Sequence, residues 1–271
     1  MSLTHFLSID EAKQLINANF RNPIKRAGAK LVVEPTKGVG VDFGAVGTAY
    51  DYWLRCEIKR NDPDIYKTFI GYRECVEPDG PSRVIAKHLD RHVKALSEFL
   101  TGSLGLRKKL FEACLFLAKF ETSYRSGYPI MTLEVARQDV EELGRIAAGT
   151  NLESFMTGHV VLNPVVGVEG SKLTIGADGD VIVDGALIDL KTSSQLTLMG
   201  NLRQLIGYWA LNELGGHPYE ISRVGVYYPR FNYSVDFSPD DLMTPVEQSR
   251  VLNFFQSKLG KIKPSKHAAV S

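Results

Sequence analysis

The chain has few cysteines, and their number and positions exclude two kinds of site. Only three occur in 271 residues, namely Cys56, Cys75 and Cys114. An odd number at scattered positions excludes a fully paired disulfide framework and a zinc or iron–sulfur site with four thiolate ligands. The sequence therefore predicts reduced thiols in a core and no iron–sulfur cluster.

A strong charge of one sign is also lacking. Lysine and arginine together number 32 and aspartate and glutamate 31, which leaves a formal net charge of +1. So small a charge exerts no general attraction on nucleic acid. Any contact with nucleic acid must therefore come from a local patch.

Long apolar runs and a secretory signal are missing as well. No segment approaches the roughly 18 apolar residues of a membrane span, and the first ten residues lack a basic region and a cleavage site. These absences predict a cytoplasmic protein without membrane contact. Hydrophobic residues make up 44% of the chain, which is enough to form the core of an ordinary globular protein.

The N-terminal part, residues 1–157, is predicted to be largely helical. Residues 45–60 have apolar side chains at helical spacing, with Gly44 and Gly47 near the start of the segment. Helical spacing returns in residues 82–100, 104–124 and 132–148, which are separated by glycine and proline.

The pattern changes at Gly158, where a predicted core region of residues 158–260 begins. Short β-branched runs predict three successive strands within 158–193. A helix is then predicted at 202–216 because its periodicity stops at a double glycine, and a buried strand follows at 221–228. A last helix is predicted at 245–259, and the polar residues 261–271 are predicted to form a disordered tail.

Two residues in the core region predict a tight hairpin. Asp184 and Gly185 lie between two apolar runs, and this dipeptide strongly favours a two-residue type I′ turn. A turn at these positions places Val183 opposite Ala186 and fixes the register of both strands.

Continued along the strands, this register groups four polar residues. It places Asp180 opposite Asp189 and Asp178 opposite Lys191, and side-chain alternation puts all four on one face. Two facing carboxylates repel each other, and Mg²⁺ or Mn²⁺ would relieve the repulsion by binding both of them and the carbonyl of Leu190. The adjacent lysine suits phosphodiester hydrolysis. The alternative is an exposed salt bridge of little energetic value between Lys191 and one aspartate.

Two motifs in this region carry a family resemblance. Asp180 and the triplet Asp189-x-Lys191 resemble the D…(D/E)-x-K signature of the PD-(D/E)XK nuclease superfamily, and the predicted order of elements matches its αβββαβ core. The following helix contains Gln204 and Tyr208 in a Q-x-x-x-Y motif, which is similar to that of RecB-type nucleases. The resemblance implies an α/β, restriction-endonuclease-like fold with a mixed central sheet and an N-terminal helical elaboration.

The resemblance also implies roles for these residues. Asp180 and Asp189 would hold the metal, with Asp178 a second candidate for the metal aspartate. Lys191 would orient or activate water, while Gln204 and Tyr208 would position the DNA strand.

A further ligand is implied on the first helix. RecB-like families carry G-x-x-x-H or an acidic residue there, and Gly47-x-x-x-Asp51 occupies the comparable place with aspartate instead of histidine. Asp51 is therefore a candidate metal ligand. Glu57, Glu112 and Glu153 are its rivals.

Several other side chains are of types that could bind a ligand. Arg203 and Thr192 are candidate phosphate donors beside the motifs. His88 and His92 have the spacing of zinc ligands, but charged neighbours favour a solvated helix face. Aromatic residues on the first helix, Tyr50, Tyr52 and Trp53, are expected in the core.

The function predicted from these observations is hydrolysis of phosphodiester bonds in DNA by a Mg²⁺- or Mn²⁺-dependent exo- or endonuclease, in repair, recombination or phage defence. RNA is left open as a substrate. The alternative is a catalytically inactive nucleic-acid-binding or scaffold protein of the same fold. The small net charge and the aspartate at position 51 support it, whereas the presence of Asp180, Asp189 and Lys191 together counts against it. A third hypothesis is a metal-dependent enzyme acting on another phosphorylated substrate.

Overall fold

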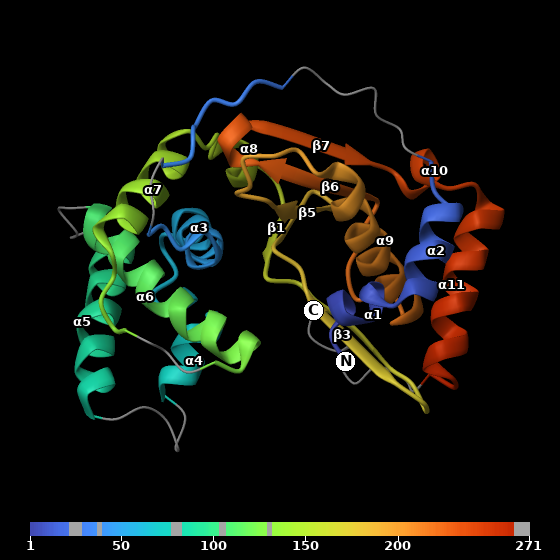
Figure 1. Cartoon of the computed structure of the whole chain (residues 1–271), viewed down its shortest axis with the longest axis horizontal. Coiled ribbons are helices and arrows are strands. Elements are labelled where there is room, and N and C mark those ends of the chain that lie inside the picture. Colours follow the sequence, from blue (N-terminus) through green and yellow to red (C-terminus); the bar gives the residue numbers. More distant parts are fainter. Residues whose placement is uncertain (22–28, 37–39, 77–82, 103–106, 129–131, 263–271) are drawn as a thin grey trace.

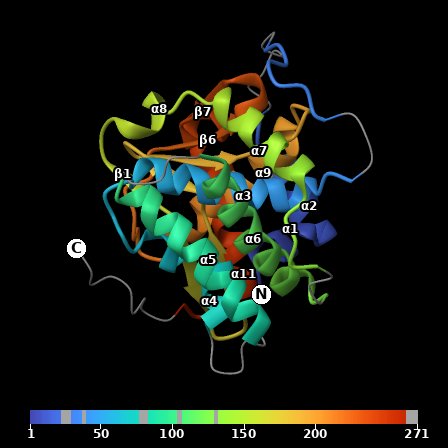
Figure 2. The same cartoon turned by 90° about the vertical axis from the view of Figure 1, so that its left-hand side faces the viewer.

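The chain forms a mixed α/β structure in which a layer of helices faces a five-stranded sheet with helices of its own (Figure 1). This computed structural model describes residues 1–21, 29–36, 40–76, 83–102, 107–128 and 132–262. Figure 2, viewed from the side of the helical layer, shows that layer in front of the sheet. The predicted α/β class is confirmed.

The helical layer is built around one central helix. Its members are α3 (Phe43–Ile58), η1 (Ile65–Thr68), α4 (Ile70–Val76), α5 (Arg83–Leu100), α6 (Arg107–Ser126) and α7 (Arg137–Ala148). α6 contacts α3, α4, α5 and α7. The helices predicted at 45–60, 82–100, 104–124 and 132–148 are present as α3, α5, α6 and α7, although α7 begins at Arg137 and residues 82 and 104–106 lie outside the described ranges. Tyr50, Tyr52 and Trp53 are all buried, so the expectation that they belong to the core is confirmed too.

The strands form one mixed sheet and one separate ribbon. They are β1 (Val160–Leu162), β2 (Val165–Glu169), β3 (Thr174–Asp178), β4 (Val181–Val183), β5 (Ala186–Leu190), β6 (Arg223–Tyr228) and β7 (Tyr233–Phe237). The sheet has the order β1-β4-β5-β6-β7, and β2 pairs with β3 alone. Within the described sheet β5 and β6 are the one parallel pair, and α9 (Leu198–Leu214) connects them. The strand order makes β5 the central strand.

The prediction of three strands before α9 is wrong, because five are present. The first predicted strand is interrupted at Asn163, whose φ is 50°, and at the proline that follows it. The second is interrupted at Gly179, whose N–H donates to the carbonyl of Pro164 at 2.8 Å. Each of these two apolar runs therefore forms two strands, although hydrophobic periodicity alone predicts one strand in each run.

The remaining helices cover the sheet and the ribbon. They are α1 (Leu3–Ser8), α2 (Asp10–Ala18), α8 (Glu153–Met156), α10 (Pro239–Leu242) and α11 (Pro245–Leu259), with a short η2 (Pro229–Phe231) after β6. α1 and α2 pack on α9. These first helices therefore lie with the sheet, although the sequence analysis assigned them to the N-terminal helical region of residues 1–157. α11 has the predicted bounds. Of the predicted tail, residues 263–271 lie outside the described ranges.

The predicted hairpin turn is confirmed, but its register extends less far than expected. Asp184 and Gly185 have φ values of 46° and 75°, as a type I′ turn requires. Val183 pairs with Ala186, and the ladder ends at the third pair, two residues further along.

The placement of Asp178 opposite Lys191 is wrong. Asp178 pairs with Val165 in the β2–β3 ribbon, while the N–H of Lys191 donates to the carbonyl of Tyr227 on β6. The break at Gly179 separates the two ladders, so the hairpin register cannot be continued through it.

One buried arginine joins the two halves of the molecule. Arg230, on η2, donates through Nε to the carbonyl of Thr192 at 2.6 Å and forms an ion pair with Glu142 of α7. Arg230 is 1% exposed and Glu142 is fully buried. Because buried charges are tolerated only when paired and hydrogen-bonded, this contact fixes the helical layer against the end of β5.

No helix in the described part of the chain has the length and apolar character needed to cross a membrane.

Gly71→Ala should destabilise the protein, because a Cβ at Gly71 would lie 1.9 Å from the carbonyl oxygen of Leu117 on α6. Overpacking of this kind costs about 1–3 kcal/mol, so urea or thermal unfolding should show a clear loss of stability. Gly176→Ala is the matched control, because no described atom lies within 4 Å of its Cβ position. Equal stability of the two variants would contradict the close packing of α4 on α6.

Candidate active site

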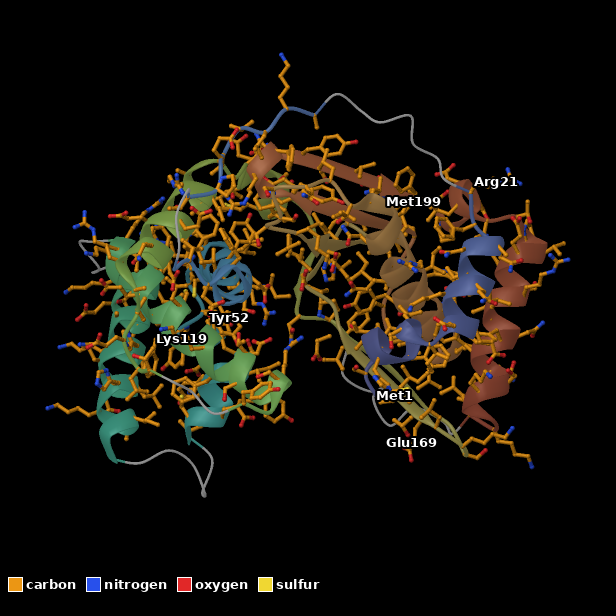
Figure 3. All side chains as sticks on the ribbon, viewed as in Figure 1. Met1, Arg21, Tyr52, Lys119, Glu169 and Met199 are labelled. Atoms are coloured by element: carbon orange, nitrogen blue, oxygen red, sulfur yellow. The ribbon has the colours of Figure 1, made fainter. Side chains whose placement is uncertain are left out.

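A cavity of about 200 Å³ lies between the helical layer and the sheet, and it gathers most of the predicted site residues. In Figure 3 side chains extend from both layers toward this space, with Tyr52 on the helical side. The lining comprises Gly47, Thr48, Asp51, Arg55, Glu121, Arg125, Asn163, Asp178, Asp180, Asp189, Leu190, Lys191, Gln204 and Tyr208. Segments far apart in the sequence therefore meet at one place.

The central strand supplies a buried acid and its lysine. Asp189 is 4% exposed, and Nζ of Lys191 lies 2.8 Å from Oδ1 and 2.7 Å from Oδ2. Only the contact to Oδ1 has hydrogen-bond geometry, so Oδ2 lacks a hydrogen-bond partner among the described residues. Burial, together with the charge of Asp180, raises the pKa of Asp189 to about 7, although Lys191 opposes the shift.

Asp180 lies beside the end of β5 rather than in the ladder opposite Asp189. Its Oδ2 accepts the N–H of Leu190 at 2.6 Å, and its carbonyl accepts the N–H of Asn163 at 3.0 Å. Its charge raises the pKa of both Asp189 and Asp51. The three carboxylates are therefore close enough to interact electrostatically.

Asp51 faces the cavity from α3 and is held by an arginine. Arg55 Nε donates to Oδ1 of Asp51 at 2.9 Å, and a second guanidinium nitrogen contacts Oδ2. Burial and then the charge of Asp180 raise the pKa of Asp51 to about 7 against the effect of Arg55. A Cβ at Gly47 would lie 3.2 Å from Oγ1 of Thr192, so the glycine allows α3 to approach the end of β5.

The Q-x-x-x-Y residues are bonded to each other. Gln204 Nε2 donates to Oη of Tyr208 at 2.9 Å, and this hydroxyl donates to the carbonyl of Asp178 at 2.9 Å. Tyr208 thereby holds the end of β3, the segment that leads directly into Asp180.

Two predicted substrate-binding residues are placed elsewhere. Arg203 lines a neighbouring pocket of about 140 Å³ with residues of α1 and α2 and with Gln204, which lines both pockets. Thr192 follows β5 and its carbonyl accepts from Arg230. Neither is among the described residues that line the cavity.

The rivals of Asp51 do not line the cavity either, as far as the described residues show. Glu57 is buried and accepts from Trp53 Nε1 at 3.1 Å. The sequence analysis did not predict Arg55, Glu121 and Arg125, which also line the cavity. The pattern that could have indicated them is an acidic residue four positions before an arginine, which occurs on both α3 and α6.

The donor set of the cavity fits a hard divalent cation. The lining contains five acidic side chains and three basic ones, a formal excess of two negative charges. Carboxylate and carbonyl oxygens are the ligands that Mg²⁺ and Mn²⁺ prefer, and the buried Oδ2 of Asp189, which accepts no hydrogen bond from the described residues, is such an oxygen. Within the described ranges, no three His, Cys, Asp or Glu side chains are already arranged as a metal-binding group.

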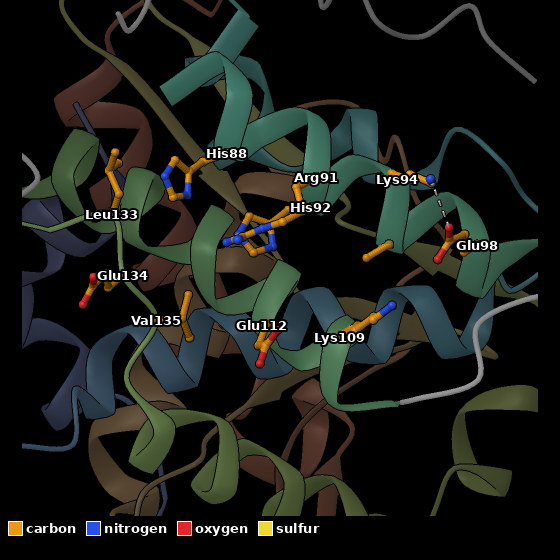
Figure 4. Close-up of a pocket in the computed structure, with 11 residues that line it drawn as sticks. His88, Arg91, His92, Lys94, Glu98, Lys109, Glu112, Leu133, Glu134 and Val135 are labelled. Carbon is orange, nitrogen blue, oxygen red and sulfur yellow. Dashed lines mark hydrogen bonds and ion pairs between the residues drawn. The ribbon is translucent and has the colours of Figure 1, made fainter. Parts of the chain in front are cut away.

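A second cavity, of about 640 Å³, lies on the other face of α6 (Figure 4). His92 in its wall is 3% exposed and stacks on Phe116 with ring centroids 4.3 Å apart. Burial, followed by the charges of Arg91 and His88, lowers its pKa to about 4. The expectation of a solvated face is thus wrong for His92. Three basic and three acidic side chains in the lining balance each other, so charge there selects no ligand.

Comparisons of the chain with protein-family models, with curated proteins and with solved structures found no match.

The free energy of unfolding in metal-free buffer should fall as the pH rises from about 4 to about 7. Asp189 and Asp51 have pKa values near 7 in the folded protein, so in this window the fold keeps protons that the unfolded chain, with a pKa of about 3.9, has released. Asp189→Asn removes one of these groups. The variant should gain roughly 2 kcal/mol on wild type between about pH 5 and pH 7, since one pKa unit is worth ~1.4 kcal/mol.

Urea titrations at several pH values measure this difference. Asp10→Asn is the control, because Asp10 is exposed and forms only a surface ion pair with Lys13. Parallel stability curves for wild type and Asp189→Asn would contradict the burial of charge at this position.

Proposed function

We propose that the protein is a RecB-like nuclease of the PD-(D/E)XK superfamily, which hydrolyses phosphodiester bonds in DNA with Mg²⁺ or Mn²⁺. The observation that carries the proposal is the cavity in which Asp180, Asp189 and Lys191 meet the hydrogen-bonded pair of Gln204 and Tyr208. These are the two motifs of the family resemblance, and one cavity brings them together.

The arrangement of elements supports the same proposal. α3 precedes the β4–β5 hairpin, and α9 then connects β5 to the parallel strand β6. This order is compatible with a restriction-endonuclease-like core in which the helical layer is an elaboration. Because β5 is the central strand, Asp189 and Lys191 stand on a rigid part of the scaffold, as precise catalysis requires.

The carboxylates of Asp180 and Asp189 and the carbonyl of Leu190 are the groups that would hold the cation. The bound ion would supply charge stabilisation at phosphorus and a more acidic water molecule. In the hydrolysis a water oxygen bonds to phosphorus, the P–O bond to the leaving nucleotide breaks, and the leaving oxygen takes a proton.

Lys191 has the properties of a charge-stabilising cation. Although burial opposes it, the charges of Asp189 and Asp180 raise the pKa of Lys191 above its ordinary value. The ammonium therefore stays protonated at neutral pH. It suits the stabilisation of negative charge on the phosphate oxygens better than proton abstraction from water.

Lys191→Ala should lower Mn²⁺-dependent DNA cleavage by ~10²–10⁴-fold, the contribution of one charge-stabilising or acid–base group. The fold should survive, since this side chain is 30% exposed. The assay compares wild type, Lys191→Ala and Lys87→Ala, an exposed lysine of α5 outside the cavity, with circular dichroism as the check on folding. Wild-type cleavage by Lys191→Ala would overturn the proposal.

Gln204→Ala should reduce cleavage by about fivefold, because it removes a hydrogen bond worth ~1 kcal/mol that orients Tyr208. The thermal stabilisation by Mn²⁺ should remain, whereas Asp180→Asn and Asp189→Asn should abolish it. Gln256→Ala, an exposed glutamine of α11, is the control. A loss of Mn²⁺ stabilisation in Gln204→Ala would contradict the proposal that Gln204 positions the substrate and does not hold the metal.

The same assays distinguish the alternative function. A wild-type protein that binds DNA in Mn²⁺ but cleaves neither DNA nor RNA would be a non-catalytic nucleic-acid-binding protein of this fold. The charged Lys191 beside two aspartates favours the enzyme, because a binding protein gains nothing from burying the carboxylate of Asp189.

A further inference from the structure

We propose that Arg55 and Arg125 form a phosphate clamp on the helical side of the cavity, which binds the nucleic-acid backbone opposite the aspartates. This inference rests on the proposed function. It assigns Asp51 to the positioning of Arg55 instead of to the metal, and it gives the helical layer a direct part in substrate binding.

Arg55 is held in one orientation by three neighbours. Its side chain is 7% exposed and donates to both carboxylate oxygens of Asp51. Its guanidinium carbon lies 5.7 Å from the ring centre of Tyr52 and 5.9 Å from that of Phe69. A planar guanidinium fixed in this way presents its remaining N–H groups in a set direction, which suits the paired oxygens of a phosphate.

Arg125 repeats the arrangement on α6. It forms an ion pair with Glu121 at 2.6 Å, and Glu121 is buried and also accepts from the hydroxyl of Tyr52. The Arg125 side chain is 59% exposed. The guanidinium of Arg125 is thus anchored by a buried acid while the side chain lines the cavity.

The two walls of the cavity differ in charge. The helical side carries Arg55 and Arg125, balanced by Asp51 and Glu121, whereas the strand side carries Asp178, Asp180 and Asp189 against Lys191 alone. A phosphodiester that enters has its negative oxygens attracted to the arginines, while the carboxylates opposite remain available to a cation. With both oxygens of Asp51 taken by Arg55, the aspartate is better suited to orient the guanidinium than to bind metal.

Acid and arginine at this spacing also occur away from the cavity, and the comparison supplies a control. Arg137 and Glu141 on α7 form an ion pair at 2.6 Å with side chains 84% and 57% exposed. Such an exposed pair contributes little. Burial of the acid and access to the cavity set the pairs of Arg55 and Arg125 apart.

The binding test uses the full chain with Ca²⁺ in place of Mn²⁺ and a labelled single-stranded DNA of about 20 nucleotides, measured by fluorescence polarisation at several salt concentrations. Arg125→Ala should weaken binding about three- to tenfold and lower the slope of log K against log salt by about 0.7, the value for one lost phosphate contact on a single strand. Arg137→Ala should bind as wild type does. Identical affinities and slopes for Arg125→Ala and Arg137→Ala would overturn the clamp.

Arg55 is buried, so its test uses a neutral pair that keeps the packing. The double variant Asp51→Asn with Arg55→Gln should keep the Mn²⁺ affinity within about threefold, since neither residue is assigned to the metal, and should lose cleavage by ~10²-fold. Asp51→Asn alone is titrated with Mn²⁺ by calorimetry beside Asp180→Asn. Loss of Mn²⁺ affinity in Asp51→Asn as large as in Asp180→Asn would overturn the positioning role.

The outcomes separate this inference from the function on which it rests. Wild-type cleavage with unaltered binding and cleavage in every arginine variant would leave the nuclease standing and refute the clamp. DNA binding that depends on Arg125 in a protein that cleaves no nucleic acid would support the clamp and refute the nuclease.

Discussion

The buried ion pair between Arg230 and Glu142 is the contact on which the site depends. The carbonyl of Thr192 also accepts from Arg230, so one side chain ties the end of the central strand to α7. Thr36 and Arg145 complete the shell around Glu142. Removal of Glu142 would leave the charge of Arg230 buried and uncompensated, which costs ~3–5 kcal/mol. The separation of the two layers, and hence the width of the cavity, follows from this contact.

A second constraint acts inside the cavity, where buried acids must be balanced locally. Three acids there pair with a base on their own element, namely Asp189 with Lys191, Asp51 with Arg55 and Glu121 with Arg125. Pairing within one element needs no contact across the cavity. The two walls can therefore each be stable before any ligand joins them, and the space between them remains open to a substrate.

Features with a local cause were predictable from the sequence, and features that need tertiary contact were not. The hairpin at Asp184 and Gly185 follows from turn chemistry, and its first pairs are as expected. The predicted pairing of Asp178 is wrong because the strand ladder breaks at Gly179, and hydrophobic periodicity does not reveal this break. Arg55 and Glu121 were missed because only the packing of α3 against α6 brings them to one cavity. Motif spacing identifies the residues on the strand side of the cavity better than it identifies those on the wall opposite.

Under the proposed function, a nearly neutral protein has to bind a polyanion through the local charge of its cavity. The whole chain carries a formal net charge of +1, so attraction must arise locally. The cavity lining itself has two more acidic than basic side chains, and such a site repels phosphate until its carboxylates are neutralised. A divalent cation on the strand side would remove this excess and leave the arginines of the opposite wall to attract the backbone. Because coupling between two ligands is reciprocal, under the proposed function a cation and a nucleic acid would each strengthen the binding of the other.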